Sequence, residues 1–162
     1  MSDTPLANDS IEDAIVHSKK YLEDILSFFG INLEVAATSD EEVIQLSVPS
    51  SQLNGFLIGQ NGDTMRSLQY LVSTELKNAN YAHSRINVDV ADYKKQRAER
   101  LSHTAEEWVK TVRDNGQPMD LEPMNPADRR IIHQLAAEYG LSSESVGDGR
   151  ERHIVLKVST EA

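Results

Sequence analysis

Cysteine is absent from the 162 residues of this chain, aromatic side chains make up only 6% of it, and basic residues are few. Without cysteine the chain has no disulfide, no iron–sulfur cluster, no cysteine-ligated zinc and no thiol nucleophile. No apolar run approaches the roughly 18 residues that a membrane span requires. The start, MSDTPLANDSIEDA, is acidic and lacks the basic and apolar regions of a signal peptide. These absences predict a soluble, cytoplasmic protein.

Negative charge is abundant but unevenly distributed. The 26 acidic residues outnumber the 16 basic ones and give a net charge of −10, which argues against non-specific binding to nucleic acid or to an anionic membrane. Residues 1–83 hold 4 basic and 12 acidic side chains, whereas residues 84–162 hold 12 basic and 14 acidic ones. The second half can therefore carry basic faces. Leucine, isoleucine, valine and phenylalanine supply 40 residues, enough for a folded core.

The first half of the chain predicts a helix–strand–strand–helix–helix–strand order. Residues 1–9 are expected to be a disordered tail, and Ser10 with Asp13 resembles a capping box at the start of a helix that Gly30 ends. Strands are expected at 31–37 and 43–48 around the turn TSDE, then a short helix at 51–58, a longer helix and a strand at 85–91. The helical positions expected to face the core are Ile11, Ile15, Leu22, Ile25, Leu26, Phe29, Met65, Leu68, Leu71, Val72 and Leu76.

The second half predicts a long helix followed by a small α/β unit. The helix covers about 92–114, and Asn115-Gly116 ends it; a strand is expected near 118–122. Asn125-Pro126 has the N-cap and first-turn residues of another helix, with Gly140 at its end. The last strand is expected at 152–158. Residues expected in or near the core are Leu101, Ala105, Trp108, Val109, Val112, Ile131, Ile132, Leu135, Ala136, Ile154, Leu156 and Val158. Two tyrosines at helical positions, Tyr70 of the first half and Tyr139 of the second, are also expected to be in the core or partly buried.

The sequence Ile58-Gly59-Gln60-Asn61-Gly62 lies between two predicted helices. Two glycines allow a tight turn, and the start of the following helix offers N–H groups to a phosphate. This element order with a GxxG loop resembles the type II KH domain, over residues 10–91, which clamps a single strand of nucleic acid with that loop. KH loops usually carry a basic residue between the glycines, which this sequence lacks; Arg66, one turn into the helix, could compensate.

The second motif is Arg129-Arg130-Ile131-Ile132-His133, which puts Arg129 and His133 on one helix face. The stretch LEPMNPADRRIIHQLA resembles the R-3-H domain, a single-strand-binding domain named for this spacing, which we expect over residues 117–160. The similarity continues through SESVGDGRERHIVLKV, where Arg152 and His153 match the family's basic pair and Arg150 could extend the patch. Within the connecting helix, 92–116, four cations have the spacing of a basic face that could bridge the two sites, or of side chains that only solvate a connector: Lys94, Lys95, Arg97 and Arg100.

A KH domain followed by an R-3-H domain resembles the Jag family (SpoIIIJ-associated proteins, also called KhpB), and we expect this chain to lack the family's separate N-terminal Jag domain. The resemblance implies cytoplasmic binding of single-stranded RNA, post-transcriptional regulation linked to cell elongation or division and hence cell shape, and pairing with a small KH protein. Single-stranded DNA and a homodimer remain open. The nucleic-acid-binding residues expected from both motifs are Gly59, Gln60, Asn61, Gly62, Arg66, Arg129, Arg130, His133, Arg150, Arg152 and His153.

Two other functional classes compete with RNA binding by the whole chain. In the first, the acidic KH half is a protein-interaction or dimerisation module and only the R-3-H part touches nucleic acid. In the second, the protein is an enzyme, but the sequence has no phosphate-binding GxxxxGK[ST] loop, no HExxH zinc helix and no GxSxG elbow. The sequence therefore predicts an α+β protein that is not an enzyme and needs neither cofactor nor metal.

Overall fold

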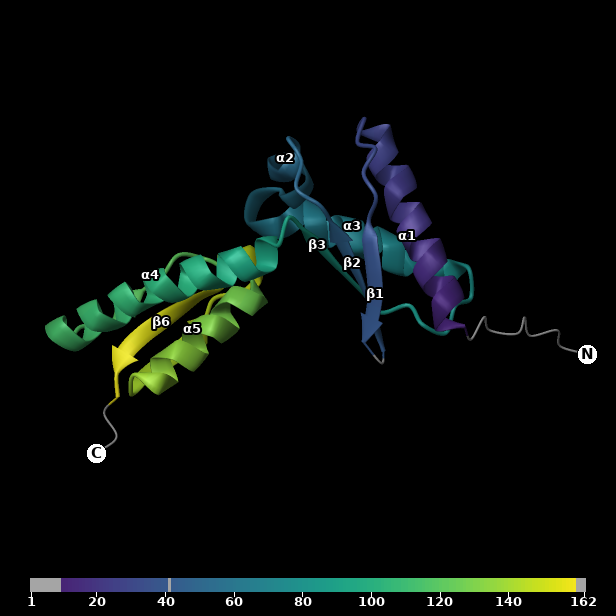
Figure 1. The fold of residues 1–162 in the computed structure, drawn as a ribbon. Coiled ribbons are helices and arrows are strands. Elements are labelled where there is room, and N and C mark those ends of the chain that lie inside the picture. The colour runs from purple at the N-terminus through teal and green to yellow at the C-terminus, as the bar shows by residue number, and fades with distance from the viewer. Residues whose placement is uncertain (1–9, 41, 160–162) are drawn as a thin grey trace, which may run out of the picture. The chain divides into compact units, whose positions relative to one another are not determined.

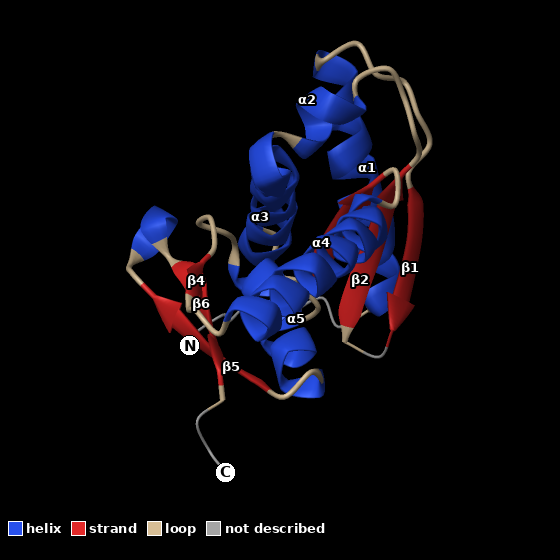
Figure 2. Ribbon diagram, turned by 90° about the vertical axis from the view of Figure 1, so that its left-hand side faces the viewer, coloured by secondary structure: helices blue, strands red, loops and turns tan. Residues whose placement is uncertain are grey.

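The computed structural model describes residues 10–40 and 42–159, so the expected disordered tail at 1–9 lies outside the described residues. The chain divides into two compact units, Met1–Tyr93 and Lys94–Ala162. Each combines helices with a three-stranded sheet (Figure 1 and Figure 2), which confirms the predicted α+β class. Within the described part of the chain, no helix is both long and apolar enough to cross a membrane.

The first unit has a sheet with one apolar and one polar face. Strand β1 is antiparallel to β2, which is parallel to β3, in the order β1-β2-β3. The pairings Ile44↔Ile86, Leu46↔Val88 and Val48↔Val90 put six buried side chains on one face, where α1 and α3 cover them. The elements are α1 (Ile11–Phe28), β1 (Ala36–Asp40), β2 (Val43–Val48), α2 (Asn54–Ile58), the 3-10 turn η1 (Gln60–Gly62), α3 (Asp63–Asn78) and β3 (Ile86–Val90).

The predicted element order of this unit is confirmed, but the predicted bounds of its first strand are wrong. Ile31 and Val35 are buried without joining the sheet, because the Val35 N–H donates to the Glu23 carboxylate at 2.9 Å instead of to a neighbouring strand. The strand begins only at Ala36 and runs through residues expected to form the turn.

Two hydrophobic residues expected in the core are exposed. Phe29 follows the last residue of α1 and is 47% exposed, so the helical periodicity no longer applies to it. Leu71 is 45% exposed because Leu68 and Val72 already define the face of α3 that meets the sheet. At the other end of α1 the predicted cap is confirmed: Ser10 Oγ accepts a hydrogen bond from the Asp13 N–H at 3.2 Å.

The second unit consists of two long helices and an antiparallel sheet in the order β4-β6-β5. Helix α4 is more than a connector, because Ala105, Val109 and Val112 on it are buried in one core with Ile132 of α5 and Leu156 of β6. The elements are α4 (Tyr93–Asn115), β4 (Met119–Asp120), α5 (Pro126–Glu138), β5 (Leu141–Val146), the 3-10 turn η2 (Gly149–Glu151) and β6 (His153–Val158).

Strand β5 is not predicted by the sequence. Its residues, LSSESV, are polar at the positions that alternate with Leu141 on the inner face, so it lacks the apolar alternation of a half-buried strand. Val158, expected to face the core, is 42% exposed, and Ile131 and Leu135 are only partly buried. The cap of α5 is as predicted: Asn125 Oδ1 accepts from the Asp128 N–H at 3.0 Å.

Candidate nucleic-acid interface

Polar side chains of α5 and β5 meet at an open edge of the second sheet. His133 Nδ1 lies 2.7 Å from Ser143 Oγ on the edge strand β5. The chain reverses at Gly140, so α5 and β5 run in opposite directions. Four helical residues rise about 6 Å and two strand residues about 6.7 Å. Arg129, one turn before His133, is therefore level with Ser145.

The loop before β6 adds a second guanidinium group to this edge. Arg152 Nε donates to Ser145 Oγ at 3.1 Å. The structure thus brings together Arg129, His133 and Arg152 beside a single strand. We call this set, with Ser143 and Ser145, the α5–β5 edge.

The cations of the α5–β5 edge are oriented by neutral oxygen atoms. Arg129 Nη1 donates to the Met124 carbonyl at 2.7 Å, and Arg152 donates to a serine hydroxyl. Among the described residues, neither guanidinium forms an ion pair with a carboxylate. Each keeps its positive charge and further N–H donors in a fixed orientation, which suits a planar anion such as phosphate.

The remaining predicted residues of this unit have different surroundings. Arg130 and Arg150 are exposed. His153 is turned to the other side, where Nδ1 is 2.9 Å from the Glu151 carbonyl and Nε2 is 3.4 Å from an Asp120 carboxylate oxygen. An acidic neighbour makes His153 a weaker candidate for binding an anion than Arg152.

The predicted basic face of α4 has to be corrected at Arg97. Its Nε and Nη2 donate to both carboxylate oxygens of Asp128, at 3.2, 3.0 and 2.6 Å. Asp128 is only 3% exposed, so this guanidinium compensates a buried charge and does not belong to a solvent-facing patch. Three predicted members of the face have exposed side chains: Lys94, Lys95 and Arg100.

The GxxG loop of the first unit needs both of its glycines. Gly59 has φ 70° and Gly62 has φ 82°, a backbone conformation that residues with a Cβ rarely adopt. A Cβ on Gly59 would lie 2.2 Å from Thr64 Oγ1 and 2.8 Å from the Thr64 nitrogen. Between them Gln60 and Asn61 are exposed. The backbone of the loop at Gly59 therefore lies close to Thr64 at the start of α3.

Gly59→Ala is expected to destabilise the protein by about 1–3 kcal/mol, because the new Cβ combines a strained φ with a clash against the α3 backbone. Gly55→Ala is the matched control, since Gly55 lies in α2 with no positive φ and nothing within 4 Å of a Cβ. Urea unfolding followed by circular dichroism measures both variants. Equal stabilities would show that the loop tolerates a side chain at Gly59.

Arg66, the cation predicted to compensate for the loop, contacts both the loop and a carboxylate. Its Nη1 donates to the Asn61 carbonyl at 3.0 Å, and its Nη2 is paired with the Asp63 carboxylate. The guanidinium thus lies over the loop with its charge partly neutralised. The prediction that Arg66 replaces a lysine or arginine between the glycines stays a prediction.

A groove that the sequence did not reveal runs along α3 beside the start of β3. It encloses about 510 Å³ and contains Arg66, Lys77 and Arg85, three of the five lysine and arginine side chains among the described residues of this unit. Tyr70 also lines it and is 70% exposed, contrary to the expectation that it lies near the core. Cations beside an exposed aromatic ring are typical of surfaces that bind single-stranded nucleic acid.

Two hydrogen bonds fix the shape of this groove. Gln69 Oε1 accepts from the Val88 N–H of β3 at 3.1 Å, and Ser73 Oγ donates to the Ser84 carbonyl at 2.7 Å. Arg85 is paired with Glu42 at 2.7 Å, but both side chains are about 70% exposed, and such a surface pair opens at little cost.

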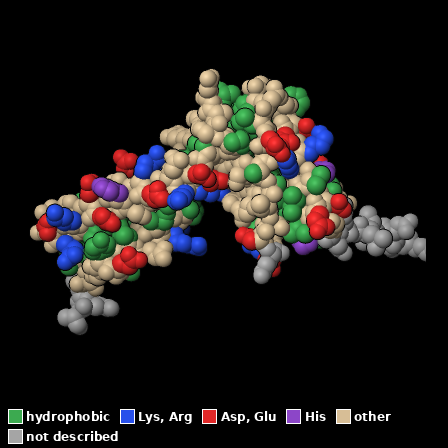
Figure 3. Space-filling model, in the orientation of Figure 1, with side chains coloured by type: hydrophobic (Ala, Val, Ile, Leu, Met, Phe, Trp, Pro, Cys, Tyr) green, Lys and Arg blue, Asp and Glu red, His purple; other side chains and the backbone are tan. Residues whose placement is uncertain are grey.

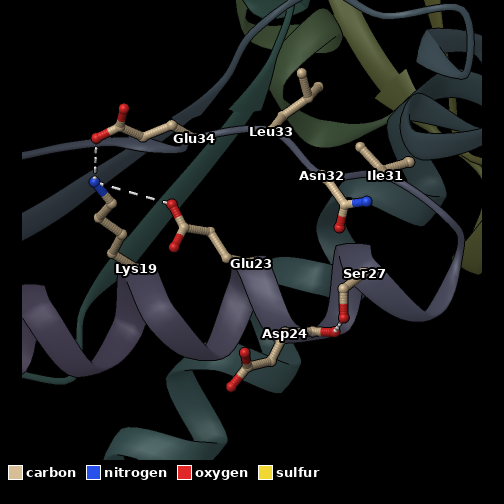
Figure 4. Close-up of a pocket in the computed structure, with 8 residues that line it drawn as sticks. All are labelled: Lys19, Glu23, Asp24, Ser27, Ile31, Asn32, Leu33 and Glu34. Atoms are coloured by element: carbon tan, nitrogen blue, oxygen red, sulfur yellow. Dashed lines mark hydrogen bonds and ion pairs between the residues drawn. The ribbon is translucent and has the colours of Figure 1, made fainter.

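A second cavity, of about 460 Å³, lies between α1 and residues 31–34 and has the opposite character (Figure 4). Lys19 donates to Glu34 at 2.9 Å; this hydrogen bond raises the pKa of Lys19 and lowers the pKa of the Glu34 carboxyl. Glu23 and Asp24 add two more carboxylates. The excess of negative charge makes this cavity unsuitable for a phosphate.

The second unit matches a known domain family. Residues 99–158 match the family model of the R-3-H domain, and the match begins inside α4. It includes Arg129, His133, Arg152 and both serines of the edge. The chain therefore contains an R-3-H domain, as the sequence predicted.

Similarity to known proteins extends over nearly the whole chain. The RNA-binding protein KhpB of Clostridium symbiosum is 27% identical over 154 residues, which cover 94% of this chain and 68% of that protein. KhpB of Bacillus subtilis (strain 168) is 26% identical over 147 residues, or 89% and 70%. For KhpB of Streptococcus pneumoniae serotype 2 (strain D39 / NCTC 7466), 26% identity over 150 residues covers 92% of this chain and 45% of that protein. The predicted resemblance is confirmed; the KH assignment of the first unit stays a prediction.

Proposed function

We propose that this protein binds single-stranded RNA and performs no chemistry, with the α5–β5 edge as its principal contact. The observation that carries this proposal is the orientation of Arg129 and Arg152 by neutral oxygen atoms, at 2.7 and 3.1 Å, beside His133. The relatives that are named RNA-binding proteins support RNA as the ligand.

Each side chain of the edge has a defined part in this proposal. The two guanidinium groups hold phosphates of successive nucleotides through the donors that their internal contacts leave available. His133 donates to a phosphate or offers its ring to an unpaired base. Exposed Arg130 and Arg150 strengthen the local field without a fixed geometry.

The first unit provides a separate RNA-binding surface as a KH-like domain. The N–H groups of the GxxG loop donate to the phosphate backbone of the RNA. The groove beside α3 binds the next nucleotides between its three cations and Tyr70. Arg66 belongs to both features, since it lines the groove and lies over the loop.

Binding of labelled oligonucleotides at several salt concentrations tests the proposal. Single-stranded RNA is expected to bind with an affinity that falls as salt rises, by about 0.7 in log affinity per log salt for each phosphate contact. A duplex of the same sequence should bind less tightly, and the RNA should stay intact. A single-stranded DNA of the same sequence decides between the two nucleic acids. Cleavage, or affinity that does not depend on salt, would overturn the proposal.

Gln60→Lys is expected to supply the cation that the GxxG loop lacks. One added phosphate contact should steepen the salt dependence of log affinity by about 0.7 and raise the affinity at low salt. Gln60→Glu should change both quantities in the opposite direction. Titration of a short RNA at several salt concentrations measures them.

Thr38→Lys serves as the matched control for added charge, because Thr38 is an exposed residue of β1. If it changes the affinity as much as Gln60→Lys does, long-range charge explains the effect and the loop is only a turn. A response to Gln60→Lys alone supports the KH assignment of this unit.

A second candidate function for the first unit is protein binding. All three phenylalanines of the chain are exposed, from 47% to 88%. The rings of Phe29 and Phe56 contact each other, with their centroids 5.1 Å apart. Hydrophobic side chains reach the surface of this unit in Figure 3. Such patches mark interfaces. Light scattering during size-exclusion chromatography, compared with a Phe28→Ser/Phe56→Ser variant, tests a homodimer; mixing with a small KH protein tests the other partner.

The cellular role within this proposal is that of a bacterial post-transcriptional regulator in the cytoplasm, linked to cell elongation or division. It rests on the resemblance to the Jag family. Crosslinking the protein to RNA in cells and sequencing the bound fragments would identify its targets. Fragments no more frequent than with an Arg129→Ala variant would contradict this role.

A further inference from the structure

The inner face of β5 carries two hydroxyl groups where a hydrophobic core would be expected. Ser143 and Ser145 alternate with buried Leu141, and they are paired in register with Leu156 and Ile154, which are both 0% exposed. Polar residues on the packed face of a strand weaken the core unless they satisfy other polar groups. Both serines do so, with His133 and Arg152 of the proposed RNA site.

We propose that Ser143 is a positioning residue, whose hydroxyl fixes the ring of His133 and determines which of its nitrogens carries the proton that is offered to RNA. This inference rests on the proposed function. Its starting point is the 2.7 Å distance between His133 Nδ1 and Ser143 Oγ, in a histidine that is half-buried between α5 and β5.

A hydroxyl differs from a carboxylate or carbonyl in that it can both donate and accept a hydrogen bond. In the arrangement that we propose for neutral His133, the Ser143 hydroxyl donates to Nδ1 and the ring proton resides on Nε2. Toward protonated His133 it accepts from Nδ1–H, and Nε2 again carries a proton. In this arrangement Nε2 is a donor for a phosphate or base oxygen in both the neutral and the protonated form of the ring.

The environment of Nε2 agrees with this assignment. Within the described part of the chain, no side chain or carbonyl is hydrogen-bonded to Nε2 of His133. The position of the ring is fixed from one side only, and Arg129 precedes it by one helical turn on the same face. A phosphate held by Arg129 can thus reach the second ring nitrogen.

The matched variants Ser143→Thr and Ser143→Val test the role of the hydroxyl, since threonine and valine have the same shape and both suit a strand. The valine variant should lose about three- to tenfold in affinity for single-stranded RNA, the range of one hydrogen bond, whereas the threonine variant should bind like the unchanged protein. Ser142→Val is the control, because Ser142 is exposed on the other face of β5.

The pH profile and the ring nitrogens separate positioning from a merely structural effect. The valine variant should lose more affinity when the ring is neutral than when it is protonated, because a neutral ring without the hydroxyl can move its proton to Nδ1. Nitrogen NMR of the free protein at high pH should show His133 protonated at Nε2, and a mixture of both tautomers in Ser143→Val.

These measurements separate the failure of this inference from that of the proposed function. If RNA binds and Arg129→Ala weakens binding, but the threonine and valine variants match in affinity and pH profile, Ser143 has no positioning role and the proposed function stands. If RNA does not bind, the proposed function fails. A ring protonated at Nδ1 in the free protein would overturn the tautomer assignment on its own.

Discussion

Replacing Arg129 and His133 together by alanine is expected to weaken binding of single-stranded RNA at least tenfold, about 1.4 kcal/mol or more. The change removes a fixed guanidinium and an oriented imidazole from the centre of the α5–β5 edge. The salt dependence of log affinity should also fall by about 0.7 for each phosphate that the variant no longer neutralises. Fluorescence anisotropy with a labelled RNA at several salt concentrations measures both quantities.

The stability of the variant must be checked beside its affinity. Both side chains make one hydrogen bond within the protein and are half-buried, so their removal should cost no more than about 1–3 kcal/mol. The matched control is Arg113→Ala/His103→Ala, which removes the same two residue types from exposed positions of α4. Equal affinities in the two double variants would show that total charge, and not the edge, governs binding.

The features that the sequence predicted correctly are local. The cap between Ser10 and Asp13 and the cap between Asn125 and Asp128 each involve residues three apart, and both occur in the structure. Strand β3 was predicted because apolar and polar residues alternate along it, and buried and half-buried side chains alternate in the structure. The pairing of Arg129 with His133 on one face follows because four residues make about one helical turn.

The features that the sequence could not reveal depend on contacts between distant residues. Strand β5 exists because β6 pairs with it, not because of its own propensity, since four of its six residues are serine or glutamate. Arg97 looked like part of a basic face because its partner Asp128 is 31 residues away. The groove beside α3 needed the structure for the same reason: Arg66 and Arg85 come together only when β3 lies against α3.

For Arg66 and Tyr70 the sequence predicts where the residue lies on α3 but not what its side chain contacts. The sequence indicates a cation near the GxxG loop. The rotamer of Arg66 decides which acceptor the guanidinium binds, and in the structure it is paired with Asp63. Tyr70 and Leu71 are neighbours on α3 that are 70% and 45% exposed, whereas the buried residues of this helix include Leu68 and Val72. Helical periodicity gives the direction of a side chain, not the reach of the surface that covers it.

Asp128→Ala is expected to destabilise the protein by about 2–4 kcal/mol, more than Gly59→Ala. Its carboxylate is 3% exposed, and it accepts from Arg97 and from Asn125 Nδ2 at 2.9 Å. Removing one member of a buried pair leaves the other charge uncompensated. The Arg97 side chain is 28% exposed and can recover some hydration, which limits the destabilisation. Urea unfolding followed by the fluorescence of Trp108, the one tryptophan, reports on this unit.

The double variant Arg97→Met/Asp128→Ala distinguishes the ion pair from the position itself. It should be more stable than Asp128→Ala, because no uncompensated charge remains. Glu138→Ala is the control for removal of an exposed carboxylate from α5 and should change the unfolding free energy by less than about 0.5 kcal/mol. If Asp128→Ala is as stable as that control, the pair contributes nothing to the fold.

The two halves of this pair should affect RNA binding in opposite directions. Asp128 directly precedes Arg129 in the first turn of α5, so its negative charge would oppose a phosphate there if Arg97 did not neutralise it. Arg97→Ala should therefore lower both stability and RNA affinity, whereas Asp128→Ala should lower stability while the folded protein binds RNA at least as tightly. Affinities measured well below the unfolding midpoint test this contrast. A parallel decrease of affinity in both variants would mean that the pair acts on RNA only through the fold.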